Sequence, residues 1–119
     1  MTRRTTLLLA LQAILFAAAS LVHAGVLFSG YEHSRAATAE GVIALVLAAG
    51  LVVSLVRPAS ARTGALVAQG FALLGTLVGA FTIAIGVGPQ TTADYVFHAV
   101  VLALLISGLI LTRRTASAS

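Results

Sequence analysis

Four long apolar stretches, separated by short polar connections, dominate this chain. They cover about residues 5–28, 39–56, 63–86 and 93–112. A helix that crosses a bilayer needs roughly 20 apolar residues, because each backbone amide has to find its hydrogen-bond partner within the segment. Short connections make successive helices antiparallel neighbours. The sequence therefore predicts an all-α fold, an integral membrane up-down-up-down bundle of four transmembrane helices, in a single domain over residues 1–119.

The composition agrees with a chain surrounded by lipid. Hydrophobic residues make up 60% and charged residues 8%, whereas about 25% of a soluble protein is charged. The net charge of +4 does not indicate nucleic acid, because the arginines stand as separated pairs rather than as one patch. The absence of cysteine excludes disulfides, thiolate metal ligands and thiol catalysis. The bilayer is the one partner that the composition requires.

The arginines indicate how the chain is oriented. Six of the seven flank one side of the four stretches, namely Arg3, Arg4, Arg57, Arg62, Arg113 and Arg114. Loops rich in arginine and lysine stay in the cytoplasm. We therefore expect a multi-pass protein of the cell membrane with both termini in the cytoplasm and the first and third connections, which hold only Arg35, outside.

Both ends of the chain call for a separate expectation. Val22-His23-Ala24 before Gly25 would suit signal peptidase, but the apolar run extends to Phe28, beyond the usual 7–15 residues of a signal core. We expect the first helix to be retained, and an intact mass tests this. The tail of small residues from Thr115 to Ser119 is expected to be disordered.

Two pairs of residues predict contacts between helices. Gly75 and Gly79 have the Gly-xxx-Gly spacing that lets helices approach closely, and we expect this face to pack within the bundle. A homo-oligomer, or membership of a larger membrane complex, stays open. Gln12 and Gln69 lie equally far into the first and third stretches, so their amides are expected to bond to each other across the bundle.

Most ionisable residues other than the arginines gather near the outward ends of the helices. His23 is expected roughly 7–8 Å below the outer end of the first helix, and His98 at a similar depth in the fourth. Glu40 opens the second helix and Asp94 the fourth, and Asp94 and His98 are four residues apart, so they share a helix face. Thr82 adds a hydroxyl at the same level. The sequence predicts one polar cluster of His23, Glu40, Asp94 and His98 near the outer face.

Three interpretations of this cluster stay open. In the first, the residues are structural, with Asp94 at the positive N-terminus of its helix and the histidines as interior hydrogen-bonding groups. In the second, they hold a metal ion, or His23 and His98 are axial haem ligands. In the third, they carry out acid–base chemistry or proton-linked passage of a small lipophilic molecule. Glu32 and His33, in the first connection, are secondary candidates that would cover the cluster.

The polar positions also resemble those of a known group of proteins. The chain is similar to small uncharacterised bacterial membrane proteins with four helices, a resemblance that implies the fold and no activity. It rests on Leu21-Val22-His23-Ala24-Gly25, Gly30-Tyr31-Glu32-His33, Ala39-Glu40-Gly41, Gly86-Val87-Gly88-Pro89, Asp94 and His98. In size the chain also resembles small multidrug-resistance transporters. Those carry a glutamate in the first helix, where this chain has Gln12, Ser20 and His23.

The function that we expect from these features is binding rather than catalysis. The predicted protein is a small membrane binding or accessory protein whose cluster holds a metal, a haem or a lipophilic ligand. The alternative is a membrane-embedded enzyme or a small proton-coupled transporter that uses the same residues for acid–base chemistry.

Overall fold

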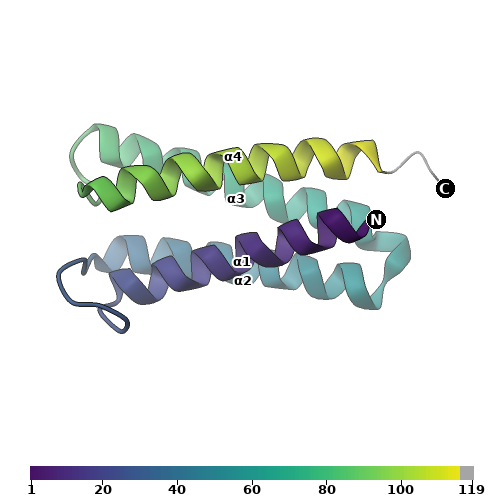
Figure 1. Ribbon diagram of the computed structural model, residues 1–119, viewed down its shortest axis with the longest axis horizontal. Helices are drawn as coiled ribbons and strands as arrows, with labels where there is room; N and C mark the ends of the chain where they lie inside the picture. The colour runs from purple at the N-terminus through teal and green to yellow at the C-terminus, as the bar shows by residue number, and fades with distance from the viewer. Residues whose placement is uncertain (116–119) are drawn as a thin grey trace.

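The chain folds into four antiparallel helices, α1 (Arg3–His23), α2 (Ser34–Val56), α3 (Ala61–Ala84) and α4 (Thr92–Arg114). The computed structural model describes residues 1–115, and a single 3-10 turn, η1 (Pro58–Ser60), precedes α3. Both termini lie at the same end of the bundle (Figure 1). All four helices are long and apolar enough to cross a membrane. The predicted all-α bundle is confirmed; residues 116–119 of the expected tail lie outside the described part.

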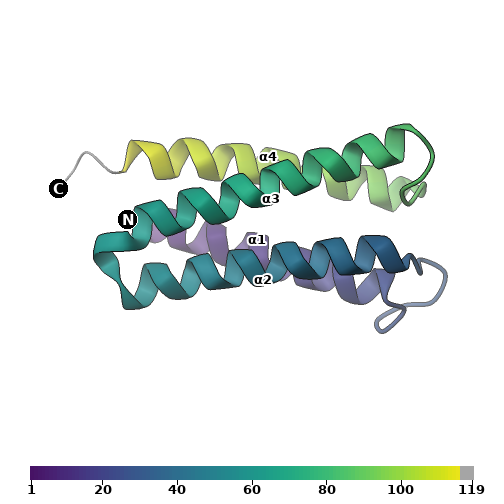
Figure 2. The same cartoon turned by 180° about the vertical axis from the view of Figure 1, so that it is seen from behind.

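The helices pack in chain order, α1 on α2, α2 on α3 and α3 on α4, and the ring closes where α4 meets α1. This closing contact is the smallest of the four. From behind, α3 starts beside α2 and runs away from it toward the other end (Figure 2). The buried core includes Leu9, Phe16, Leu47 and Leu105, one or two from each of the helices α1, α2 and α4. Helix α3 is therefore closer to α2 at the end with the N-terminus than at the opposite end (Figure 2).

Helices α2 and α3 approach closely at Gly50. A Cβ atom added to Gly50 would lie 2.6 Å from the Cβ of Ala68 and 3.2 Å from the carbonyl oxygen of Gly64. The predicted pair of glycines faces side chains instead. A Cβ on Gly75 would meet Ile43 Cδ1 of α2 at 2.9 Å, and one on Gly79 would meet a histidine of α4 at 3.1 Å. Both predicted glycines thus face the interior of the bundle.

The outer ends of the helices differ from the prediction. α1 ends at His23 and not at residue 28, because Gly25 takes the left-handed conformation with φ of 79° and the N–H of Val26 bonds to the carbonyl of Leu21. α3 ends at Ala84 in the same way, with Gly86 at φ of 80°. α2 begins earlier than residue 39, at Ser34. The predicted first helix extended to residue 28 because residues 26–28 are apolar. Hydropathy carries no information on backbone conformation, so it could not locate the turn at Gly25.

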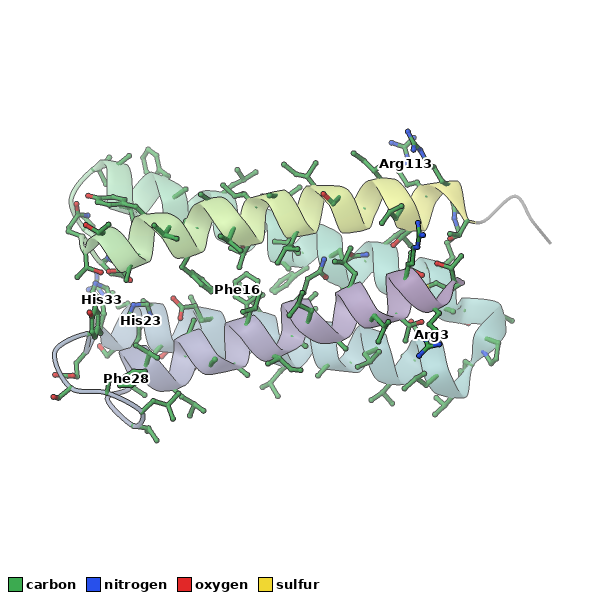
Figure 3. The ribbon with its side chains drawn as sticks, in the orientation of Figure 1. Arg3, Phe16, His23, Phe28, His33 and Arg113 are labelled. Carbon is green, nitrogen blue, oxygen red and sulfur yellow. The ribbon has the colours of Figure 1, made fainter. Side chains whose placement is uncertain are left out.

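The charged residues sort by end as the sequence indicated. Arg3 and Arg113 lie at the end with the termini, whereas His23 and His33 lie at the opposite end, beyond Phe16 (Figure 3). The α2–α3 connection with Arg57 belongs to the first group. We call the two ends the arginine end and the histidine end.

Candidate functional site

His23 lies at the centre of a buried group of three ionisable side chains. Its Nδ1 is 2.9 Å from Oε2 of Glu40, and its Nε2 is 2.8 Å from Oδ1 of Asp94. Each of the three residues is only 5% exposed. The group joins α1, α2 and α4 at the histidine end, and we call it the His23 triad.

Local structure positions each member. His23 is the last residue of α1, since the glycine turn follows it, so it lies at the helix end and not roughly 7–8 Å below it as predicted. Glu40 lies nearly two turns inside α2, because that helix starts at Ser34. Asp94 is the third residue of α4 and forms a capping box with Thr91. The early end of α1 and the early start of α2 bring His23 level with Glu40.

The hydrogen bonds set the smallest number of protons that the triad holds. Each nitrogen–oxygen contact of His23 needs one hydrogen between its two atoms, because a lone pair on both sides would repel. With two hydrogens, the group is either an imidazolium between two carboxylates or a neutral imidazole with one carboxylic acid, and its net charge is −1. A third proton on Oε1 of Glu40 would preserve both contacts and make the triad neutral.

The two carboxylates differ in what else they bind. Oδ2 of Asp94 accepts hydrogen bonds from the N–H of Thr91 at 3.0 Å and from its hydroxyl at 2.5 Å. Oε1 of Glu40 accepts no hydrogen bond from residues 1–115. Hydrogen bonds to a carboxylate favour its ionised form. Asp94 is thus held as a structural anion, and Glu40 keeps one oxygen free for another partner.

The structure separates His98 from the triad. Its Nδ1 bonds to the backbone carbonyl of Asp94 at 2.9 Å, and not to the carboxylate as the four-residue spacing suggested. His98 lies one turn deeper in α4 than Asp94. Of the four residues predicted to form one cluster, His23, Glu40 and Asp94 are joined by hydrogen bonds, and the side chain of His98 is not joined to theirs. Thr82 donates to the carbonyl of Gly79 at 2.7 Å and also stands apart from the triad.

The two loop candidates have structural contacts at the histidine end. Nδ1 of His33 accepts from the N–H of Ala36 and caps α2, and Nε2 of the same ring contacts the carbonyl of Val87 at 3.3 Å. His33 thereby ties the α1–α2 connection to the α3–α4 connection. Oε1 of Glu32 accepts from the N–H of Gly30 at 2.6 Å on the surface.

Two cavities flank the triad. One, of about 240 Å³, is partly open and lies mainly between α2, α3 and α4, with Phe16 of α1 on its wall; its lining includes Glu40, Gly79, Thr82, Phe97 and His98. We call it the α2–α4 pocket. The other, of about 460 Å³, lies at the α1–α4 contact, and its lining includes Leu15, Val22, His23, Asp94 and Phe97. We call it the α1–α4 pocket. The triad therefore stands between two cavities, with Glu40 on one side and His23 and Asp94 on the other.

A second polar group lies deeper, toward the arginine end. The amide of Gln12 donates to Oε1 of Gln69 and to the carbonyl of Leu104, both at 3.0 Å, which confirms the predicted bond between the two glutamines. Gln69 in turn donates to the hydroxyl of Thr112 at 3.0 Å. Oε1 of Gln12 is buried and has no partner within residues 1–115. This group links α1, α3 and α4 and lines neither pocket.

The geometry of the triad does not suit a metal ion or a haem. Both ring nitrogens of His23 are already bonded to carboxylates, so neither has a lone pair to give to a metal. The side chains of residues 1–115 include no group of three or more His, Cys, Asp or Glu arranged to hold a metal ion. Binding a metal at His23 would require at least one of these hydrogen bonds to break.

The sequence interpretation missed two residues that shape the site. Thr91 fixes Asp94, and the spacing Thr-Thr-Ala-Asp is a recognisable capping-box pattern. Phe97 lines both cavities and packs edge-on against Phe16 at 5.6 Å between ring centres. No pattern in the sequence marks Phe97, because an aromatic residue in an apolar helix carries no sign of which face it occupies.

Comparison with known proteins adds no relative. No protein-family model, no curated protein and no solved structure matches the chain. Of the predicted resemblance, the four-helix architecture is what the structure supports, and the chain is assigned to no family. The length and composition of its helices make it a four-span membrane protein with a buried His23–Glu40–Asp94 cluster.

Proposed function

We propose that the protein is a membrane binding protein whose α2–α4 pocket takes up a small, mostly apolar molecule. One observation carries this proposal: a cavity of about 240 Å³ with mainly apolar walls is lined by Glu40, which has an oxygen without a partner in the described chain. Ligand sites commonly combine apolar walls with a few polar groups. An engineered apolar cavity of about 150 Å³ binds benzene, so this pocket has room for roughly ten non-hydrogen atoms.

The position of the pocket favours a ligand that arrives from the membrane or its surface. The pocket lies at the histidine end, where α3 diverges from α2 (Figure 2). His33 and Arg35 lie on its lining at the start of α2, next to the loops. A lipophilic molecule concentrates in the bilayer, so a pocket at this level meets it at a high local concentration.

A pocket-filling variant tests this function. Ala39 lines the α2–α4 pocket, and Ala49, on the same helix, is exposed and lines neither cavity. We expect the purified protein in nonionic micelles to bind para-tert-butylbenzyl alcohol with a Kd of about 1 mM or tighter. Ala39→Phe should weaken binding at least tenfold, while Ala49→Phe should leave it unchanged. Equal affinity in the two variants, or no saturable binding to the unaltered protein, would contradict the proposal.

A second function, proton-coupled passage of the ligand, is favoured by the place of the triad between the two pockets. Two hydrogen bonds connect Glu40 to Asp94 through the ring of His23, which is a route by which a proton passes from one cavity to the other. Ligand-driven acidification or alkalinisation inside proteoliposomes tests it. Identical pH traces with and without protein would exclude passage and leave binding intact.

We also propose that the protein resides in the cell membrane with both termini in the cytoplasm. Six arginines at the arginine end against Arg35 at the other support this orientation. The chain contains no cysteine, so Ser29→Cys in the first connection and Ser60→Cys in η1 are single labelling sites. In whole cells, a membrane-impermeant maleimide should label the first and not the second. Labelling of the second alone would reverse the orientation.

A further inference from the structure

Three polar side chains of the α2–α4 pocket offer hydrogen-bond acceptors, namely Glu40, Thr82 and His98, whereas Arg35 and His33, near the start of α2, bring donors. Nδ1 of His98 contacts a carbonyl, which only accepts, so this nitrogen carries a hydrogen, and Nε2 offers a lone pair when it carries none. A Cβ added to Gly79 would lie 3.1 Å from that Nε2, and both residues line the pocket. The hydroxyl of Thr82 donates its hydrogen to the carbonyl of Gly79 and keeps its lone pairs.

Glu40 adds a charged acceptor to this set. Its Oε2 is bonded to His23, and its Oε1 accepts nothing from the described residues. In the two-proton form the triad has a net charge of −1, and Glu40 is the member that lines the pocket, so this form gives the pocket a negative wall. A molecule that brings only acceptors, or a negative charge, would meet repulsion there.

Two other ionisable side chains line the pocket, and neither pairs with Glu40. Nδ1 of His33 accepts from a backbone N–H and its Nε2 faces a carbonyl. Arg35 also lines the pocket, but it is exposed at the start of α2, where solvent screens its charge, and no ion pair within residues 1–115 joins it to Glu40. α3 contributes the uncharged Thr82. His23 and Asp94, within the triad, are already included in its charge.

We infer that the ligand of the α2–α4 pocket is a lipophilic amine in its protonated form. This inference rests on the proposed function of the pocket and names its ligand class. An ammonium group has several N–H donors and one positive charge, which match the acceptors Glu40, Thr82 and His98. Charge-assisted hydrogen bonds are the stronger kind, and the apolar walls would cover the hydrocarbon part of the molecule.

Three probes of equal shape test the ligand class on the unaltered protein. They are para-tert-butylbenzylamine, the corresponding alcohol and para-tert-butylbenzoate, titrated calorimetrically into the protein in nonionic micelles at neutral pH, with empty micelles subtracted. A hydrogen bond to a charged group exceeds a neutral one by enough to give about a tenfold difference in affinity. We expect the amine to bind about tenfold tighter than the alcohol, and the benzoate to bind most weakly.

The outcomes separate this inference from the proposed function. If the alcohol or the benzoate binds as tightly as the amine, and Ala39→Phe still weakens it, the pocket binds ligands but the amine class is wrong. If no probe binds saturably, the proposed function fails and the inference fails with it. Both results come from the unaltered chain or an alanine-to-phenylalanine change, so neither depends on removing a buried charge.

A matched pair of variants then tests whether the carboxylate of Glu40 is the group that favours the amine. Glu40→Gln removes the negative charge and keeps the size of the side chain, and Glu32→Gln makes the same change at the same end on a surface carboxylate that lines neither pocket. We expect Glu40→Gln to reduce the amine-to-alcohol affinity ratio from about ten to about one, while Glu32→Gln leaves the ratio unchanged. An unchanged ratio in Glu40→Gln would overturn the role of this carboxylate.

Discussion

A single added methyl group at Gly108 should break the glutamine contact that links α1, α3 and α4. A Cβ on this residue of α4 would overlap Oε1 of Gln69 and lie 2.6 Å from Nε2 of Gln12. Both atoms end flexible side chains, so they can swing away. They can do so only by giving up the hydrogen bonds between the two amides and to Leu104 and Thr112.

The size of the effect follows from the bonds at risk. Hydrogen bonds between membrane helices contribute about 0.6 kcal/mol each on average and up to about 1.7. Losing three of them therefore costs about 2–5 kcal/mol, against up to about 1 kcal/mol gained because alanine is the better helix former. Gly70→Ala in α3 measures that gain alone, since a Cβ at Gly70 meets nothing within 4 Å. We expect Gly108→Ala to be less stable than Gly70→Ala by about 2 kcal/mol or more.

Reversible unfolding in mixed micelles of increasing SDS fraction, followed by far-UV circular dichroism, measures these free energies. A double-mutant cycle with Gln69→Ala isolates the contact, because the nearest clashing atom is then absent. In that background Gly108→Ala should cost less than about 0.5 kcal/mol, which gives a coupling energy of about 1–2 kcal/mol. An equal cost in both backgrounds, or a stability equal to that of Gly70→Ala, would refute the explanation.

Four further changes test other parts of the bundle by the same unfolding assay. His23→Leu should destabilise by about 3–5 kcal/mol, because two buried carboxylates lose their shared partner; a loss under about 1 kcal/mol would mean that the triad is solvated. Thr91→Ala should cost only about 1 kcal/mol, the value of a helix cap, and a neutral result would show that the capping box is not formed. Gly50→Ala should cost about 1–3 kcal/mol by overpacking, and Ala68→Gly should restore most of it; no rescue would argue against the close α2–α3 contact. Gly25→Ala should cost about 1 kcal/mol, because a residue with a side chain is strained at a φ of 79°. An unchanged stability would mean that Gly25 does not adopt this left-handed conformation.

The sequence predicts the helices of this fold because lipid imposes simple rules on length and composition. The number of helices, their antiparallel order and the position of the arginines follow from those rules. Where each helix ends does not follow, since residues 26–28 are as apolar as the helix before them. Gly25 and Gly86 end α1 and α3 through their backbone conformation, to which a hydropathy profile is blind.

Part of the candidate site was predictable in the same sense. Depth along the helices was enough to pair Gln12 with Gln69, because both lie where two straight helices pass each other. The same argument grouped His98 with His23, and there it failed. The difference in depth between His23 and His98 depends on where α1 ends. His98 contacts the backbone carbonyl of Asp94 and not its carboxylate, because Thr91 binds that carboxylate in the capping box. Whether the site residues bind a ligand stays a prediction.

The small contact between α1 and α4 determines how the bundle can assemble during synthesis. The first three helices already pack in order, but His23 and Gln12 find Asp94 and Leu104 only in α4, which is made after them. Until α4 arrives, His23 has Glu40 as its partner and Gln12 has Gln69, and their remaining hydrogen-bonding capacity faces the seam or the surrounding lipid, where unmet polar groups are costly. An incomplete or misinserted chain therefore displays polar groups within the bilayer, and the finished bundle conceals them. The docking of α4 is thus the step that completes the hydrogen bonding of His23 and Gln12.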